Sequence, residues 1–191
     1  MTCVALLRHY PTAWNTEGRL QGRTDIPLDA AARALLAGLR LPPPWDRARL
    51  FASALDRAAE TARLLAGGRP VTIDPHLAEL GFGAWEGRRT AELAADPATG
   101  FIPSNEWGPD DRAPGGESLA EAWARLAPAL AAIAADPAPA VIVTHKSVMR
   151  LILRRAGAAD PEIKRGRLYP LALDGAGRPR DPGPPVRLVP R

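Results

Sequence analysis

The chain has 191 residues, enough for one domain with a sizeable core, and 46% of its residues are hydrophobic. Its 25 basic and 21 acidic residues leave a formal net charge of +4, and the basic residues are scattered along the chain rather than gathered in one stripe. With only 5% aromatic residues and no apolar run of about 18 residues, this composition argues against a single-strand nucleic-acid binder and against a membrane-spanning protein.

Short apolar runs alternate with helical patterns along the chain. Strands are predicted near residues 3–8, 48–52, 70–73, 140–144 and 168–173, and helices near 29–39, 56–66, 88–95, 118–134 and 147–156. In the longest of these helices, an apolar stripe is typical of core packing rather than of a cofactor site: Leu119, Ala122, Trp123, Leu126, Leu130 and Ile133. The alternation predicts a single α/β domain over residues 1–191, a three-layer sandwich whose mostly parallel central sheet carries helices on both faces.

Two of the three histidines follow predicted strands directly. His9 comes after the first strand and is preceded by Arg8, and His145 comes after the strand at 140–144. Residues just past the carboxyl ends of such strands line the crevice where ligands bind. Arg57, in the first turn of a predicted helix, faces the same crevice, and two arginines with two histidines indicate a pocket for a doubly charged anion such as phosphate. Taken singly, each histidine is more often structural, and Arg57 alone could be an exposed helix residue paired with a glutamate.

Two segments lack a regular pattern. Residues 96–117 hold several prolines and glycines, and a stretch of this length without periodicity is usually functional or mobile. Residues 175–191 form a proline-rich tail that cannot be helical. We expect this tail either to add a short strand near 186–188 or to drape over the surface.

Five blocks of sequence, in order, carry a resemblance to a known family. They are Leu7–Asn15 with Gly18–Leu28, then Ser53–Ala62, Leu77–Gly87, Pro114–Ser118 and Val143–His145. The ordered set, covering about residues 4–155, resembles the histidine phosphatase superfamily in its phosphoglycerate-mutase-like branch, whose hallmark is Arg-His-Gly near the N-terminus. Any one block is a weak signal, but the order makes the set specific. The fold implied by the resemblance, phosphoglycerate mutase-like, agrees with the α/β sandwich predicted above.

The resemblance implies catalytic roles for the residues of the predicted anion pocket. His9 becomes the nucleophile that forms a phosphohistidine, and Arg8, Arg57 and His145 surround the transferring phosphoryl group. In the family, the equivalent of residues 96–117 covers the phosphate pocket, so this segment is predicted to be a substrate lid.

The resemblance also assigns an acid and two supporting contacts. Glu79 takes the role of general acid and then of base, with Glu86 as the alternative acid. Asn15 and Gln21 match positions that approach the phosphate or the substrate. The residues around Asn15 also favour a turn on their own account, so its role as a ligand and its role in the turn both stay open.

The sequence departs from the family pattern at three positions near the pocket. Tyr10 replaces the glycine that usually follows the nucleophile, and Lys146 and Ser147 replace a small Gly-Gly pair. We place Tyr10 and Lys146 among the substrate-binding residues. Tyr10 either narrows the pocket or points away from it, and Lys146 either adds a cation near the phosphate or is solvated.

The predicted function is hydrolysis of a small phosphomonoester without a cofactor or metal. The Pro114–Ser118 motif and the short block around Glu79 most resemble α-ribazole phosphatases and broad-specificity phosphatases, so α-ribazole 5′-phosphate is the leading substrate. The alternatives are a phosphoglycerate mutase, although mutases are typically longer, and a phospho-ligand-binding protein without turnover.

The remaining features concern partners and location. No Cys/His spacing suggests zinc, and His76 is interpreted as structural. We expect no nucleic-acid or membrane partner, and a monomer or homodimer. The single cysteine and the absence of a signal-peptide pattern lead us to expect a cytoplasmic protein.

Overall fold

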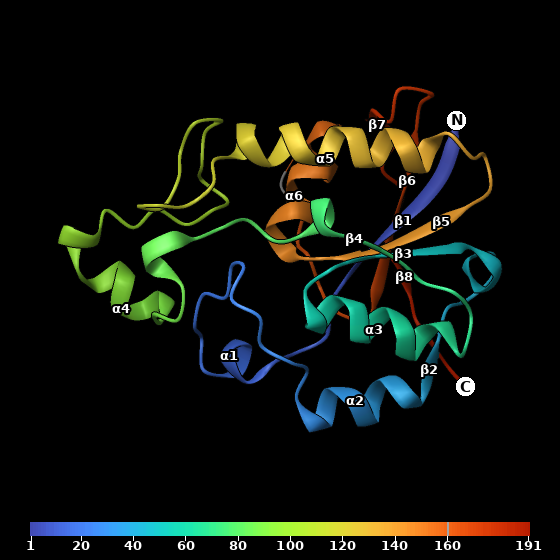
Figure 1. The fold of residues 1–191 in the computed structure, drawn as a ribbon, viewed down its shortest axis with the longest axis horizontal. Helices are drawn as coiled ribbons and strands as arrows, with labels where there is room; N and C mark the ends of the chain where they lie inside the picture. Colours follow the sequence, from blue (N-terminus) through green and yellow to red (C-terminus); the bar gives the residue numbers. More distant parts are fainter. Residues whose placement is uncertain (160) are drawn as a thin grey trace.

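The computed structural model describes residues 1–159 and 161–191, and in these residues seven strands form one central sheet (Figure 1). The strand order is β4-β3-β5-β1-β6-β7, and β8 pairs with the start of β6 whereas β7 pairs with its end. The bounds are β1 Thr2–Arg8, β3 Arg49–Ser53, β4 Thr72–Asp74, β5 Ala140–Thr144, β6 Arg167–Leu173, β7 Pro179–Arg180 and β8 Val186–Arg187. A separate two-stranded sheet joins β2 (Leu39–Arg40) to β9 (Val189–Pro190).

The sheet is mixed rather than parallel throughout. Strands β4, β3, β5 and β1 run parallel, whereas β6 is antiparallel to β1, and β7 and β8 are antiparallel to β6. Strand β1 lies beside β5 with Arg8 opposite Thr144, and the His9 amide continues the ladder by donating to the Thr144 carbonyl at 2.9 Å. This register brings the two histidines that follow these strands to the same edge of the sheet.

Helices cover both faces of the sheet, as predicted. Figure 1 shows α2 (Ala30–Ala37) and α3 (Asp56–Ala66) on one side, and α5 (Leu119–Ala134) and α6 (Lys146–Arg155) on the other. Alternate side chains of β1 enter two separate core clusters, Val4 and Leu6 in one and Ala5 and Leu7 in the other. The short helices α1 (Ala13–Thr16) and α4 (Thr90–Ala95) lie beyond the end of the sheet where the histidines emerge. The predicted three-layer α/β sandwich is therefore confirmed.

Helix α5 shows why the predicted apolar stripe packs as core. Ser118 caps the helix through a capping box with Glu121, and Ala122, Leu126, Leu130 and Ile133 are buried. Leu119 and Trp123, at the flank of the stripe, are only partly buried. The Trp123 ring instead carries the Arg155 guanidinium 4.2 Å from its centroid.

The two irregular segments are both tied to the domain. In the tail, the strand predicted near 186–188 is observed at Val186–Arg187, and further short strands pair with β6 and β2. In the 96–117 segment, Trp107 is buried and its ring packs edge-on against Phe82, with centroids 5.7 Å apart. Phe101 makes a similar contact with Trp85 at 5.1 Å. Within the described chain, no helix combines the length and apolar character that a membrane crossing requires.

Candidate active site

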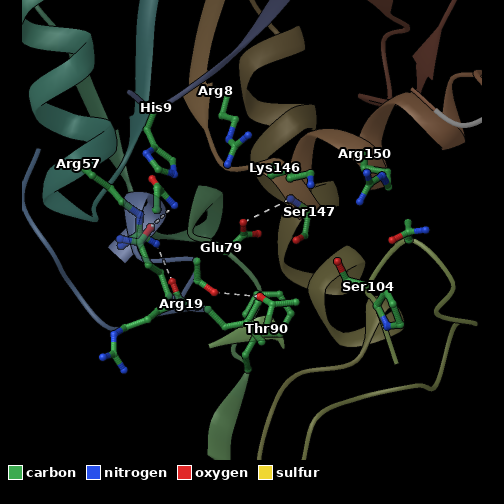
Figure 2. Close-up of a pocket in the computed structure, with 18 of the residues that line it drawn as sticks. Arg8, His9, Arg19, Arg57, Glu79, Thr90, Ser104, Lys146, Ser147 and Arg150 are labelled. Carbon is green, nitrogen blue, oxygen red and sulfur yellow. Dashed lines mark hydrogen bonds between the residues drawn. The ribbon is translucent and has the colours of Figure 1, made fainter. Parts of the chain in front are cut away.

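A cavity of about 360 Å³ opens at the carboxyl edge of the parallel strands (Figure 2). Its walls come from the end of β1, the loop after α1, the start of α3, the segment around Glu79, the first turns of α6 and the 96–117 segment. Parallel strands and the helices that follow them place polar side chains at such an edge. The fold therefore brings close together the residues that the sequence assigns to an anion pocket, although they come from distant parts of the chain.

His9 is buried and presents one ring nitrogen for chemistry. Its Nδ1 lies 2.7 Å from the Tyr10 carbonyl oxygen, and because a carbonyl can only accept, Nδ1 carries the proton and donates. The lone pair is then on Nε2. Burial lowers the pKa of His9 well below 6.5, and the nearby Arg57 and Arg8 lower the pKa further. His9 is therefore a neutral imidazole whose free nitrogen can act as a nucleophile.

His145 is fully buried against His9 and does not itself line the cavity. The two ring centroids are 5.1 Å apart with the ring planes at 53°. His145 Nε2 lies 2.8 Å from Ser53 Oγ, whereas Nδ1 has no hydrogen-bond partner among the described residues. Burial, followed by the charge of Arg57, lowers the pKa of His145 well below 6.5. Nδ1 is therefore the ring atom of His145 that remains available for a further hydrogen bond.

Arg57 and Arg8 supply the positive charge next to His9. Arg57 is fully buried, and its guanidinium donates to the carbonyls of Gly22 at 2.6 Å and Thr24 at 2.9 Å. Arg8 Nη1 donates to Ile163 O at 3.5 Å, and desolvation lowers the pKa of Arg8 to about 10. The Nε atoms of both arginines are buried without a partner among the described residues, and both side chains line the cavity. Such orphaned donors are what a bound anion satisfies.

Glu86, the alternative acid, organises the loop that holds Arg57. Its carboxylate accepts from the amides of Arg23 at 3.0 Å, Thr24 at 2.9 Å and Phe82 at 2.9 Å, and from Thr24 Oγ1 at 2.6 Å. Glu86 does not line the cavity. These bonds commit both carboxylate oxygens to fixing the loop, and the loop in turn aims its carbonyls at Arg57.

Gly22→Ala is expected to destabilise the protein by about 2 kcal/mol or more and to lower activity. Gly22 has φ +56°, and an added Cβ would lie 2.0 Å from Glu86 Oε1, so the loop that holds Arg57 must shift. Urea unfolding and steady-state kinetics measure the two effects. Gly100→Ala is the matched control, because Gly100 has φ +58° with no atom within 4 Å of the added Cβ. Equal losses in both variants would show that backbone strain, not the contact with Glu86, is responsible.

Glu79 is buried with its carboxylate directed into the cavity. Its Oε1 accepts from the Leu80 amide at 3.0 Å, and its Oε2 accepts from the Ser147 amide at 3.3 Å, at the start of α6. Figure 2 shows this carboxylate facing the space that His9 and Arg8 also face. On the other side of the segment, Arg125 Nη2 donates to the Glu79 carbonyl at 3.1 Å and holds the backbone in place. Among the described residues, Glu79 is thus the one carboxylate that lines the cavity.

Asn15 has the local structural role considered for it, and both Asn15 and Gln21 lie where they could contact a ligand. Asn15 completes the capping box of α1 with Thr12, and both amide side chains also line the cavity. Asn15 Nδ2 donates to Gln21 Oε1 at 3.4 Å, and Gln21 Nε2 donates to Thr12 Oγ1. Arg165 Nη2 donates to Asn15 Oδ1 at 2.7 Å and Arg165 Nε to the His9 carbonyl at 3.3 Å, which links this wall to the nucleophile.

The structure corrects the placement of Tyr10 and places Lys146. Tyr10 does not line the cavity, because the chain leaves β1 here and directs its ring into the core cluster that contains Leu7 and Leu168. Its contribution is the carbonyl that orients His9. Lys146, at the start of α6, does line the cavity.

Several residues that line the cavity were not predicted from the sequence. Arg150 lies one turn after Lys146 on α6, so the i,i+4 spacing was a usable signal. Arg19 is in the block around Gly18 but has no spacing of its own that marks it. Ser104 and Asn105 come from the 96–117 segment, which therefore does reach the cavity.

The free energy of unfolding is expected to decrease as pH is lowered from 6.5 to about 5.5. His9 and His145 are held neutral in the folded protein, while in the unfolded chain they protonate near 6.5. Their contribution is full above 6.5 and is lost as pH falls, at up to about 1.4 kcal/mol per pH unit for each histidine. Urea unfolding at several pH values tests this, and His145→Asn should remove about half of the slope. A flat profile would contradict the buried neutral pair.

The chain is similar to known proteins both in sequence and in structure. The model of the histidine phosphatase superfamily (branch 1) matches residues 4–172. A probable phosphoglycerate mutase GpmB from Enterobacter sp. (strain 638) is 36% identical over 143 residues, which cover 69% of this chain and 62% of that protein. The chain therefore spans less than two thirds of the length of this curated relative.

Solved structures of other proteins match this structure over nearly the whole chain. TTHB049 from Thermus thermophilus has a TM-score of 0.76 and 35% identity, covering 98% of this chain and 99% of that one. A structure described as phosphoglycerate mutase from the same organism gives the same TM-score of 0.76, identity of 35% and coverage of 98% and 99%. The mycobacterial glucosyl-3-phosphoglycerate phosphatase Rv2419c has a TM-score of 0.75 at 24% identity, covering 90% and 93%, which supports the fold alone.

Proposed function

The chain belongs to the histidine phosphatase superfamily, and we propose that it hydrolyses a small phosphomonoester through a phosphohistidine on His9. One observation carries the proposal. The proton on His9 Nδ1 is donated to the Tyr10 carbonyl, so the lone pair of Nε2 is free in a cavity lined by Arg8 and Arg57. A neutral nucleophile beside two cations suits in-line attack on a phosphoryl group.

In the first half-reaction, the lone pair of His9 Nε2 forms a bond to phosphorus. The bond from phosphorus to the ester oxygen breaks, and that oxygen leaves with the electron pair. Glu79, as the acid, gives it a proton so that it departs as an alcohol. The charge on the three remaining phosphoryl oxygens is stabilised by Arg8, Arg57 and the Nδ1 side of His145.

In the second half-reaction, water attacks the phosphohistidine. Glu79, now ionised, accepts a proton from the water as the oxygen bonds to phosphorus, and the bonding pair of the P–N bond returns to Nε2. Inorganic phosphate and the starting state of the enzyme result. No other carboxylate among the described residues lines the cavity, so one group serves as acid and base in turn.

Two substrate classes compete under this proposal. α-Ribazole 5′-phosphate is favoured by the resemblance of the Pro114–Ser118 and Glu79 blocks to α-ribazole phosphatases. Phosphoglycerates are favoured by the names of the relatives, which are probable phosphoglycerate mutases. Those names also support a second candidate function, transfer of a phosphoryl group between positions of a phosphoglycerate.

The test measures products rather than substrate loss. The wild-type protein is incubated in EDTA with α-ribazole 5′-phosphate, 2-phosphoglycerate or 3-phosphoglycerate, with and without 2,3-bisphosphoglycerate. Release of inorganic phosphate that does not depend on the bisphosphate is the expected result. Interconversion of the two phosphoglycerates, stimulated by the bisphosphate, would identify a mutase. Tight binding of vanadate without turnover of any ester would identify a binding protein.

A further inference from the structure

The lining of the cavity holds more cationic than anionic side chains, although one of the cations, Arg19, is paired at 2.6 Å with Glu17, which lies outside the lining. Among the described residues that line it, five carry a permanent or titratable cation and one carries a carboxylate. The cations are Arg8, Arg19, Arg57, Lys146 and Arg150. Arg8 and Arg57 lie next to His9, where the phosphoryl group is held under the proposed function. Figure 2 shows Lys146 and Arg150 together on α6, extending away from His9 past Arg8.

Lys146 is placed in a locally unfavourable electrostatic environment. It lies one helical turn from Arg150, and like charges at this spacing destabilise a helix. Partial burial, then the charges of Arg150 and Arg8, lower the pKa of Lys146. No carboxylate of residues 1–159 or 161–191 forms an ion pair with Lys146. The charge of Glu79, which lines the same cavity, favours the ammonium form of Lys146 but acts without a direct ion pair, so the ammonium faces the cavity with no carboxylate of the described chain bound to it.

The 96–117 segment adds neutral hydrogen-bonding groups to the same cavity. Ser104 and Asn105, from the 96–117 segment, line the same cavity. The segment is held to α6, because Arg154 Nη2 donates to the Asn105 carbonyl at 2.7 Å. A hydroxyl and an amide facing a cationic helix surface suit an oxygen-rich anion.

We propose that the substrate carries, beside its phosphomonoester, a second anionic group that binds to Lys146 at the α6 wall of the cavity. This inference rests on the proposed function, and it narrows the substrate class to phosphomonoesters that also bear a carboxylate or a second phosphate. Lys146 stands where the family commonly has glycine, so the subsite belongs to this chain rather than to the family pattern. α-Ribazole 5′-phosphate has only one anionic group and would leave the subsite empty.

The experiment compares three phosphonates that the enzyme cannot hydrolyse. Propylphosphonate carries one anionic group, 2-carboxyethylphosphonate replaces its methyl group with a carboxylate, and ethane-1,2-bisphosphonate carries a second phosphonate. Dissociation constants are measured by calorimetry. We expect the wild type to bind at least one doubly anionic probe about tenfold more tightly than propylphosphonate. Which of the two is preferred distinguishes a carboxylate from a second phosphate.

The chain offers a matched control, since Lys146 and Lys164 are its only lysines. Lys164 pairs with Glu162 at 2.9 Å and does not line the cavity. Lys146→Gln is expected to abolish the tenfold preference, and Lys164→Gln, with the same change in net charge, to retain it. A wild type without the preference, including one that binds none of the probes, overturns the inference. So does a preference that survives in Lys146→Gln. Because binding is measured without turnover, a failure here is distinguishable from a failure of the proposed hydrolysis.

Discussion

His9→Ala is expected to lose hydrolysis of p-nitrophenyl phosphate by about 10⁴-fold or more, measured in EDTA. The alanine variant has no imidazole nitrogen to attack phosphorus, and no second histidine lines the cavity formed by the described residues. Arg8 and Arg57 stay in place and stabilise only direct attack by water, which accounts for any residual rate.

His76→Ala provides the control for this experiment. His76 is exposed, lies outside the cavity and contacts Asp74 at 2.8 Å, so its removal is expected to leave the rate near that of the wild type. If His9→Ala and the wild type hydrolyse the ester equally, His9 is not the nucleophile. If both are inactive, the result favours a selective phosphatase, a mutase or a binding protein.

Trapping the intermediate gives an independent measurement. The wild type, quenched in alkali during turnover, is expected to carry a phosphate that is released by acid, as is typical of a phosphorus–nitrogen bond. His9→Ala is expected to carry none. Phosphate bound to a hydroxyl side chain, which survives acid, would place the covalent step on another residue.

The sequence predicted those site residues whose position follows from a short-range pattern together with the chain topology. His9 and His145 were placed by the ends of two apolar runs, and the parallel pairing of β1 with β5 does bring them together. The burial of Arg57 was not predictable in the same way. It depends on carbonyls of Gly22 and Thr24, more than thirty positions earlier in the chain, whose loop is held in turn by Glu86.

The differences between the predicted and the observed structure have physical causes as well. The side chain of a residue just past the end of a strand can point to either side of the sheet. The sequence therefore could not decide whether Tyr10 enters the pocket or the core. The strands β2, β7 and β9 have two residues each, too few to show alternation, and they form only because the tail returns to the sheet. The antiparallel direction of β6 is likewise set by its connection rather than by its own residues.

Glu79→Gln is expected to reduce kcat/KM for an alkyl phosphomonoester by about 10³-fold, and for p-nitrophenyl phosphate by far less. An alkoxide leaves only with a proton, whereas p-nitrophenolate is stable without one, so only the alkyl ester depends on the acid. The glutamine oxygen can still accept from the Leu80 or Ser147 amide, which preserves the local structure. With p-nitrophenyl phosphate, the loss of the base slows the attack of water, so a burst of nitrophenol equal to the enzyme concentration is also expected.

Glu86→Gln distinguishes the loss of the general acid from the loss of the hydrogen bonds that hold the 22–24 loop. Glu86 accepts four hydrogen bonds from the 22–24 loop and Phe82 and lies outside the cavity, so its substitution should lower stability and reduce the rates of both esters together. The decisive quantity is the ratio of kcat/KM for p-nitrophenyl phosphate to that for the alkyl ester. A ratio that rises in Glu79→Gln and not in Glu86→Gln supports Glu79 as the acid. The reverse result would transfer the role to Glu86 and require the loop to open during turnover.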